Sequence, residues 1–310
     1  MSAITVFGIM VADMVARVEN FPEIGETILG SELNVYLGGK GINQCVAAKR
    51  LGGDVEMIGC LGNDENGKMF IDLLEAENIK HDKVYIKDGI PTGVSQLQID
   101  HTGQNKIVVI PSANHEFGIN ELEQVKNVFD CTEYAVFQLE MKYDVTEKAI
   151  CLAYEKGVKV VLNPAPAQKL PMELLSIIDY ITPNEVELGI LADEDTSTKE
   201  GIKKAAEKLV SVRVKNVVAT LGSQGAIIAN KDGIRFIDGY VIKSPVDTVA
   251  AGDSFNGALV VRLQEGASLE EAVKFANAMG ALTVQVKGAI PSLHTRSEVE
   301  NFMSGFRPLS

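Results

Sequence analysis

Residues 145–162, VTEKAICLAYEKGVKVVL, join a long amphipathic segment to a short apolar run. The same succession recurs along most of the chain. Apolar runs without alternation predict buried strands at residues 4–9, 55–60, 134–139, 158–162, 180–182 and 217–221. Amphipathic segments predict helices at residues 42–51, 67–77, 120–129, 145–156, 198–210, 251–264, 269–286 and 295–304. Apolar strands separated by helices predict an α/β fold, with a mainly parallel sheet flanked by helices on both faces.

Two segments depart from this pattern because polar and apolar residues alternate in them. Residues 32–37 place Leu33, Val35 and Leu37 on one face, and residues 94–110 contain two alternating runs around a turn at 101–104. Alternation predicts strands with one solvent-facing side. These strands predict either a small separate sheet, such as a lid over a site, or an antiparallel edge of the main sheet.

The composition limits what the chain binds. Its 310 residues, 46% hydrophobic and 23% charged, predict a single ordinary globular domain spanning residues 1–310. A net charge of -13 without a Lys/Arg-rich run argues against nucleic-acid binding, which depends on neutralising phosphates. No apolar run approaches the ~18 residues of a membrane span, and the first residues lack the pattern of a signal peptide. We therefore expect a cytoplasmic protein without a membrane partner.

Four cysteines are present, at positions 45, 60, 131 and 151, and no two of them form a C-x-x-C pair. This spacing favours neither a disulfide framework nor a zinc site. We expect all four to be buried, reduced side chains.

The sequence DTVAAGD at residues 247–253 directly precedes and begins the predicted helix 251–264. Small residues at a helix start leave its first backbone N–H groups uncovered, and these groups with the helix dipole form an anion site. Asp253 would lie beside that site and would accept a proton from an attacking alcohol. Taken alone, however, an Asp at this position is more often a helix N-cap residue.

A second glycine-rich segment, LGGKGINQ at residues 37–44, leads into the predicted helix 42–51. Its glycines permit close approach of a ligand to the backbone, and Lys40 and Asn43 add hydrogen-bond donors. The segment is not a P-loop, because Gly41 follows Lys40 where that motif requires Ser or Thr. The chain also has no G-x-G-x-x-G motif of a dinucleotide site.

Together these two segments resemble the signature regions of the ribokinase (PfkB) family of carbohydrate kinases. The resemblance extends over nearly the whole chain, through blocks at residues 21–27, 138–140, 163–167, 182–187, 220–225 and 287–292. It implies ATP-dependent phosphorylation of the primary hydroxyl of a small free sugar, most closely a pentose such as D-ribose. It also implies a ribokinase-like fold with a β-lid at about residues 11–40 and 91–111, and a homodimer that pairs through the lid.

The resemblance also assigns roles to individual residues. Asp253 corresponds to the catalytic base, and the backbone of Ala251 and Gly252 to the anion hole. The sugar contacts correspond to Asp13, Gly39, Lys40, Gly41, Asn43, Glu140 and Asp253. The nucleotide contacts correspond to Asn184, Glu187, Thr220, Gly222, Ser223, Gly225, Gly252 and Asn277, and Glu187 also organises Mg²⁺ indirectly. A K⁺ site corresponds to Asp247, Ser292 and the carbonyl groups of Val249, Thr283, Val286 and Gly288.

One position departs from the family pattern. Ribokinases usually carry Asn two residues before the sugar-binding Asp, where this chain has Val11. Because valine cannot hydrogen-bond a sugar hydroxyl, one interpretation is a site that prefers a sugar lacking one hydroxyl, such as 2-deoxyribose. The other is that Val11 is only a strand residue whose lost contact another residue replaces.

Two further alternatives are a nucleoside kinase of the same family and a non-catalytic sugar- or nucleotide-binding relative. A nucleoside kinase needs an apolar pocket for a base beside the sugar, and an aromatic content of 6% shows no stacking platform. The retained Asp253, Gly252, Asn184 and Glu187 argue against a non-catalytic relative, since a binding-only protein needs no base at the transfer point.

Overall fold

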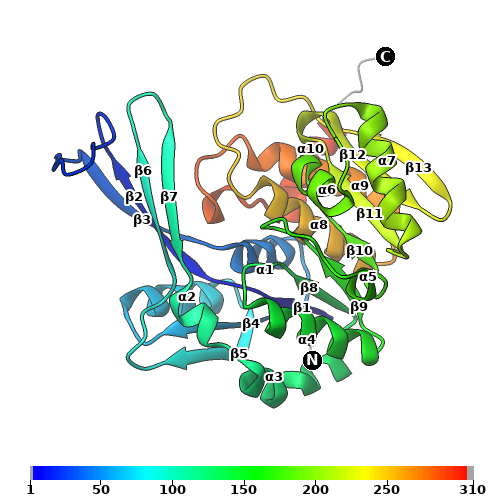
Figure 1. The fold of residues 1–310 in the computed structure, drawn as a ribbon, viewed down its shortest axis with the longest axis horizontal. Helices are drawn as coiled ribbons and strands as arrows, with labels where there is room; N and C mark the ends of the chain where they lie inside the picture. Colours follow the sequence, from blue (N-terminus) through cyan, green and yellow to red (C-terminus); the bar gives the residue numbers. More distant parts are fainter. Residues whose placement is uncertain (1–2, 306–310) are drawn as a thin grey trace.

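A computed structural model describes residues 3–305, and the main body of this part is built on a sheet of nine strands (Figure 1). From β11 to β5 neighbouring strands run parallel, whereas β12 and β13 form an antiparallel edge. The mainly parallel sheet predicted from the sequence is confirmed. Its spatial order is β13 (Gly233–Asp238), β12 (Gly225–Asn230), β11 (Asn216–Thr220), β10 (Tyr180–Ile181), β9 (Lys159–Leu162), β8 (Tyr134–Phe137), β1 (Ile4–Phe7), β4 (Val55–Gly62) and β5 (Lys80–Lys87).

Helices cover both faces of this sheet and enclose an apolar core on each. Consecutive strand residues serve different cores, as Val6 and Phe7 do, because successive side chains point to opposite faces. This explains why the strands are apolar throughout. One core contains α1 (Lys40–Arg50), α2 (Glu65–Ala76), α8 (Ala251–Gln264), α9 (Leu269–Thr283) and α10 (Arg296–Gly305). The other contains α3 (Ile119–Val125), α4 (Tyr143–Glu155), α5 (Met172–Leu175), α6 (Glu185–Ala192) and α7 (Lys199–Ser211).

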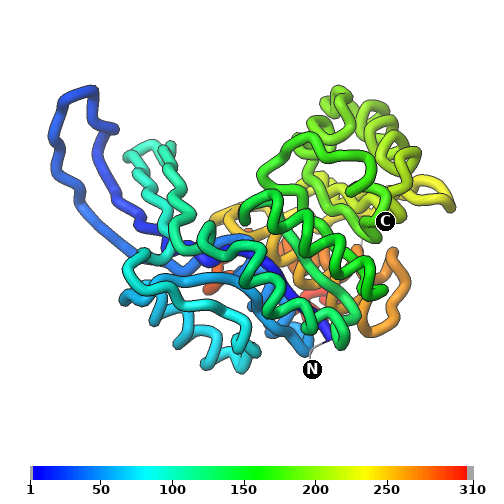
Figure 2. Tube along the Cα trace, turned by 60° about the horizontal axis from the view of Figure 1, so that its bottom comes forward, coloured from blue at the N-terminus to red at the C-terminus, as the bar shows by residue number. Residues whose placement is uncertain are grey.

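A second sheet, the lid sheet, stands away from the main body (Figures 1 and 2). Its four described strands lie in the order β3 (Glu32–Gly38), β2 (Val11–Arg17), β6 (Val94–Ile99) and β7 (Asn105–Ile110). Strand β2 pairs antiparallel with β3 and parallel with β6, and β6 and β7 form a hairpin. The alternating segments therefore form a separate sheet and not an edge of the main one.

Some details of the sequence prediction were wrong. Strands β5, β12 and β13 were not predicted, and the expected helix 120–129 is divided into α3 and a 3-10 helix at Lys126–Asp130. The helix expected at 269–286 ends at Thr283, because the chain then turns and the Val284 carbonyl accepts hydrogen bonds from Val246 and Asp247. Residues 1–2 and 306–310 of the predicted domain lie outside the described part.

The four cysteines all lie in the described part, and all are free thiols. Cys45 and Cys60 are buried as expected, but Cys151 is half-buried and Cys131 is exposed. Cys131 lies directly after the 3-10 helix, in the connection to β8, where no core covers it. Within residues 3–305, none of the helices has the length and apolarity needed to cross a bilayer.

Candidate active site

The N-terminus of α8 opens toward a pocket. The chain enters the helix through Ala250, whose φ of 61° is left-handed, and no described side chain caps the helix. Asp253 is therefore not the N-cap residue; it lies in the first turn. A Cβ atom on Gly252 would meet open space, and Gly252 lines the pocket. The first N–H groups of α8 and its dipole thus remain available to an anion.

The Asp253 carboxylate is 8% exposed and receives one amide hydrogen bond on each oxygen. Asn43 Nδ2 donates to Oδ2 over 2.9 Å, and Gln44 Nε2 donates to Oδ1 over 3.0 Å. Both amides belong to α1, which packs against α8. The glycine-rich segment and the DTVAAGD segment, 210 residues apart at Asn43 and Asp253, therefore meet at one carboxylate.

The other predicted sugar contacts gather around the same place. Lys40 Nζ lies 3.8 Å from Glu140 Oε1, and the Lys40 backbone N–H donates to Glu140 Oε2 over 3.2 Å. Asp13, on β2 of the lid sheet, accepts a hydrogen bond from the Ser95 hydroxyl on β6. The predicted sugar contacts thus come from α1, from the segment after β8 and from the lid sheet.

Gly39 and Gly41 allow the start of α1 to approach the end of β1. Gly39 has a φ of 101°, and a Cβ atom there would lie 2.8 Å from the carbonyl oxygen of Ile9. A Cβ atom on Gly41 would lie 2.7 Å from the backbone of Gly8. A side chain at either position would push the helix away, so these glycines fix where Lys40 stands.

Burial and the neighbouring charges change the pKa values of the side chains in this cluster. Burial raises the pKa of Glu140 to about 7, with the charge of Lys40 opposing the shift. Burial also raises the pKa of Asp13, against the hydrogen bond from Ser95. For Lys40, burial alone would lower the pKa, but the carboxylates of Asp253, Glu140 and Glu187 raise it above its ordinary value. One lysine thus balances several carboxyl groups.

A pocket of about 310 Å³ adjoins the N-terminus of α8. The predicted nucleotide contacts that line it are Thr220, Gly222, Ser223, Gly225, Gly252 and Asn277. Sequence reasoning missed its apolar lining, formed by Tyr240, Ile242, Pro245, Phe255, Ala281 and Val284. These residues come from the 240–245 loop and from α8 and α9, so only the tertiary fold brings them together. Apolar walls with a few polar groups are typical of a small-molecule site.

Asn184 and Glu187 are outside the lining of this pocket. They form the capping box of α6, in which each backbone N–H donates over 2.8 Å to the other residue's side chain. A β-bridge pairs Asn184 with Thr220, which does line the pocket. Burial raises the pKa of Glu187, and the Asn184 hydrogen bond and the charge of Lys40 oppose it. Glu187 therefore lies within electrostatic range of Lys40 and Asp253.

The predicted cation-site residues lie at the end of α9, in the segments before α8 and after α9, and in the 3-10 helix Ile290–Ser292. Hydrogen bonds hold these segments together. Asp247 accepts from the backbone N–H of Gly288 over 2.9 Å and of Val249 over 3.0 Å. The Ser292 hydroxyl is buried and donates to the carbonyl of Ala289 over 2.7 Å. A set of carboxylate, hydroxyl and carbonyl oxygens suits a hard cation, and backbone carbonyls are typical K⁺ ligands.

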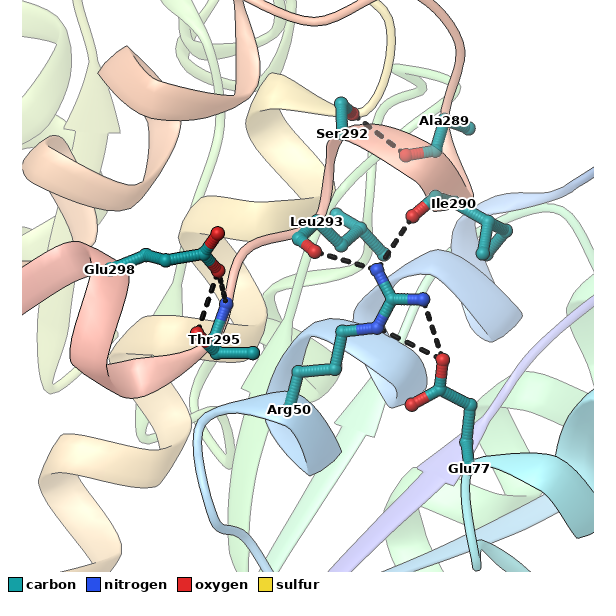
Figure 3. Close-up of polar contacts among 8 residues, drawn as sticks. All are labelled: Arg50, Glu77, Ala289, Ile290, Ser292, Leu293, Thr295 and Glu298. Atoms are coloured by element: carbon teal, nitrogen blue, oxygen red, sulfur yellow. Dashed lines mark hydrogen bonds and ion pairs between the residues drawn. The ribbon is translucent and has the colours of Figure 1, made fainter.

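Arg50, in the last turn of α1, holds the turn that contains Ser292 (Figure 3). Its Nη1 donates to the carbonyls of Ile290 and Leu293 over 2.8 and 2.6 Å. Its Nε and Nη2 donate to Glu77 over 2.9 and 2.5 Å. The same helix thus carries Lys40 at its start and this clamp at its end. Sequence reasoning missed Arg50, because backbone carbonyls 240 residues away leave no sequence signal.

Comparison with known proteins shows the family of the chain. A model of the pfkB family of carbohydrate kinases matches residues 1–296. The chain belongs to the pfkB family. The ribokinase of Haemophilus influenzae is 38% identical over 300 residues, which cover 97% of this chain and 98% of that protein. The ribokinase of Schizosaccharomyces pombe is 35% identical, over 96% of each chain.

Solved structures of pfkB-family ribokinases share the fold. The Arabidopsis thaliana ribokinase complexed with ribose and ATP matches with a TM-score of 0.91 and 31% identity, over 99% of each chain. The Thermotoga maritima ribokinase matches with a TM-score of 0.89 and 34% identity, over 98% of this chain and 100% of that one. This chain is a ribokinase-type sugar kinase, an ATP-dependent phosphotransferase, as its motifs predicted.

Proposed function

We propose that this pfkB-family kinase transfers the γ-phosphoryl group of ATP to the primary hydroxyl of a free pentose, with D-ribose as the first candidate. The observation that carries the proposal is the position of Asp253. Its carboxylate lies beside the uncapped N-terminus of α8, where the pocket lined by Gly252 meets the cluster of Lys40 and Glu140. The related Arabidopsis ribokinase is complexed with ribose and ATP, which supports both ligands.

The proposed reaction needs one base and one anion site. Asp253 takes the proton of the sugar hydroxyl while the hydroxyl oxygen attacks the γ-phosphorus and the bond to the β-phosphate oxygen breaks, releasing ADP. The N–H groups at Ala251 and Gly252 stabilise the charge that develops on the transferred phosphoryl group. Positioning and charge neutralisation are the main requirements of such a transfer.

The nucleotide would occupy the pocket that includes Thr220, Gly222 and Asn277, with its base against the apolar lining. Mg²⁺ would supply neutralisation of the phosphate charge. Glu187 fits an indirect role toward this ion, since one of its carboxylate oxygens is used in the capping box and the other is available. Among the described residues, no three His, Cys, Asp or Glu side chains gather as a metal-binding group. Mg²⁺ that is bound mainly by phosphate oxygens and water needs few protein ligands.

A monovalent cation, K⁺ in the first place, would bind between the loops of Asp247 and Ser292. The carbonyls of Val249, Val286 and Gly288 belong to the adjoining segments, and that of Thr283 belongs to the last residue of α9. Asp247 begins the segment that leads into α8 through Ala250. A cation bound by Asp247 would therefore influence the backbone at the N-terminus of α8, where the anion site lies.

A 2-deoxypentose is the second candidate substrate, because of Val11. On β2, Val11 lies two residues before Asp13, so both side chains point to the same face of the lid sheet. Val11 is 3% exposed and belongs to the apolar core cluster that also contains Ile9 and Met141. An apolar side chain on the sugar-facing side suits a sugar that lacks one hydroxyl.

Pairing of two chains through the lid sheet is also part of the proposal. Cross-strand partners share a face, so Asp13, Ser95 and Val109 lie on one face of the lid sheet, and Val35 and Val108 lie on the other. Val35 is 37% exposed and Val108 is 60% exposed. An exposed apolar face next to the edge strand β7 favours contact with a second copy.

The test is a coupled assay of ADP release with Mg-ATP. It covers ribose, 2-deoxyribose, fructose, fructose 6-phosphate, adenosine, inosine and uridine. We expect turnover of one free pentose well above the others, and a kcat lower by about 10²–10⁴-fold in Asp253→Asn, which keeps the fold but lacks the base. A sugar kinase whose Asp253→Asn variant retains full kcat would contradict the assigned base. Preferred turnover of a nucleoside would overturn the pentose.

A further inference from the structure

A set of buried amide side chains is hydrogen-bonded to Asp253 and to one another. Gln44 is its centre and is 1% exposed. Gln44 Nε2 donates to Asp253 Oδ1 over 3.0 Å and to Asn163 Oδ1 over 3.1 Å, and its Oε1 accepts from Gln138 Nε2 over 2.7 Å. All three hydrogen bonds join side chains, which is unusual in a protein interior dominated by backbone hydrogen bonds.

The supports of Gln44 come from the ends of neighbouring parallel strands. Gln138 directly follows β8 and Asn163 directly follows β9. Asn163 Nδ2 in turn donates over 3.2 Å to the carbonyl of Thr182, which directly follows β10. The amides are therefore anchored at the carboxyl ends of adjacent strands in the middle of the main sheet.

These contacts leave the Gln44 amide one orientation. Because Gln138 donates to its oxygen, the NH₂ group must face Asn163 and Asp253, and an ionised Asp253 carboxylate can only accept. Asn43 holds the other carboxylate oxygen, so rotation of the carboxylate is restrained at both atoms. Buried amides are costly, and among the described residues the oxygens Asn43 Oδ1 and Gln138 Oε1 of this set find no hydrogen-bond partner. Apolar side chains would fill the same space at lower cost.

We propose that Gln44 is a positioning residue for the catalytic base. It holds the Asp253 carboxylate in the orientation that receives the proton of the sugar hydroxyl, and Gln138 and Asn163 hold Gln44. The inference rests on the proposed role of Asp253 as the base. Gln44 reaches the reaction only through Asp253, so its loss slows the chemical step and leaves sugar affinity nearly unchanged.

Two variants test the inference. Gln44→Met keeps the length of the side chain and removes all three hydrogen bonds, and we expect kcat to fall by about 10–100-fold while KM for the sugar changes by less than about threefold. Gln44→Glu is isosteric and places a second carboxyl group against Asp253. Because two carboxylates at such a distance disfavour joint ionisation, we expect the acidic limb of the kcat–pH profile to move to higher pH by about one unit or more.

Thr5→Val is the matched control for loss of a buried polar contact. The hydroxyl groups of Thr5 and Thr132 share a hydrogen bond over 2.6 Å, and Thr132 precedes β8, whereas the Gln44 partners Gln138 and Asn163 follow the carboxyl ends of their strands. We expect this variant to lower the unfolding temperature without moving kcat or the pH profile. If Gln44→Met does not fold, the pH profile of Gln44→Glu decides.

Wild-type kcat in Gln44→Met, or an unmoved pH profile in Gln44→Glu, would overturn the positioning role and leave Gln44 a purely structural residue. The result for Asp253→Asn separates this failure from a failure of the proposed function. If Asp253→Asn keeps full activity, Asp253 is not the base and the proposed function fails. If Asp253→Asn is inactive but Gln44→Met and Gln44→Glu behave like the wild type, only the positioning role of Gln44 fails.

Discussion

The ammonium group of Lys40 lies 3.8 Å from the carboxylate of Glu140, and the backbone N–H of the same lysine donates to the other carboxylate oxygen. Despite this cation, burial raises the pKa of Glu140 to about 7. Desolvation therefore outweighs the ion pair at this position. A carboxyl group with such a pKa changes its charge within the physiological range.

Sugar affinity should depend on the ionisation of Glu140. The ionised carboxylate accepts hydrogen bonds from sugar hydroxyls more strongly than the neutral acid does. We therefore expect KM for the sugar to fall as pH rises through about 7, the pKa of Glu140. Glu140→Gln cannot ionise, and its KM should be higher and flat over the same range. Initial-rate kinetics at saturating ATP across that range measure both, and an equally pH-dependent KM in Glu140→Gln would contradict the assignment.

Ionisation of Glu140 should lower the stability of the folded chain, although it should strengthen sugar binding. Its pKa in the folded chain, about 7, lies above the ordinary value of 4.5, so the folded state favours the protonated form. The stabilising contribution is fully present below the ordinary value and is lost as pH rises through the folded value. Urea unfolding of the wild type and Glu140→Gln should show a difference that declines over this window. A difference that stays constant with pH would refute the linkage.

Substrate preference should change on substitution of Val11. In Val11→Asn the added amide, on the same face as Asp13, would form a hydrogen bond with the ribose hydroxyl that 2-deoxyribose lacks. We expect the ratio of kcat/KM for ribose to that for 2-deoxyribose to rise by about tenfold, which corresponds to a hydrogen bond worth about 1–3 kcal/mol. Val11→Ala, which changes packing without adding a donor, is the control. An unchanged ratio in Val11→Asn would leave Val11 a strand residue only.

The sequence predicted the parts of the fold that local pattern controls. Runs such as Val160–Leu162 lie between two cores, so their lack of alternation follows directly from the parallel sheet. Strand β5 was missed because it lies at the edge of the sheet and mixes exposed and half-buried residues. The hairpin of β12 and β13 adds an antiparallel edge that the repeated strand–helix pattern does not predict.

The site was predictable where motif residues act through their own backbone or charge. Gly39, Gly252 and Asp253 are of this kind, since each occupies a helix start. Gln44 and Arg50 were assigned no role, because their partners are distant residues that only the packed fold places beside them. The apolar lining around Tyr240 and Phe255 was missed for the same reason.

Dimerisation should depend on the lid face opposite Asp13. The double substitution Val35→Glu and Val108→Glu introduces buried like charges into an interface formed by that face, so we expect a dimer to dissociate to monomer. Sedimentation velocity measures the change. Met172→Glu, which alters a residue of α5 that is 62% exposed, is the control and should leave the assembly unchanged. An unchanged sedimentation coefficient in the double variant would place any dimer contact elsewhere.

Potassium activation should depend on Arg50. In Arg50→Lys a single ammonium cannot donate to Ile290, Leu293 and Glu77 together, because it lacks the planar guanidinium fork. We expect a loss of stability of about 1–3 kcal/mol, since these carbonyls lie at a partly buried site. The turn of Ser292 is then held less firmly, and the K⁺ concentration for half-maximal activation should rise severalfold, with the wild type more active in K⁺ than in Na⁺.

The control for this prediction is Lys156→Met, which removes an exposed ion pair to Asp130 beside α4, on the opposite face of the main sheet from α1. Exposed pairs contribute about 0–1 kcal/mol, so this variant should keep both its stability and its K⁺ response. Thermal unfolding with K⁺ or Na⁺ gives a readout independent of turnover, because a cation that binds the folded chain raises its unfolding temperature. If K⁺ raises the unfolding temperature of Arg50→Lys as much as that of the wild type, Arg50 does not support the cation site. If neither protein distinguishes K⁺ from Na⁺ in turnover or unfolding, the assignment of Asp247 and Ser292 fails instead.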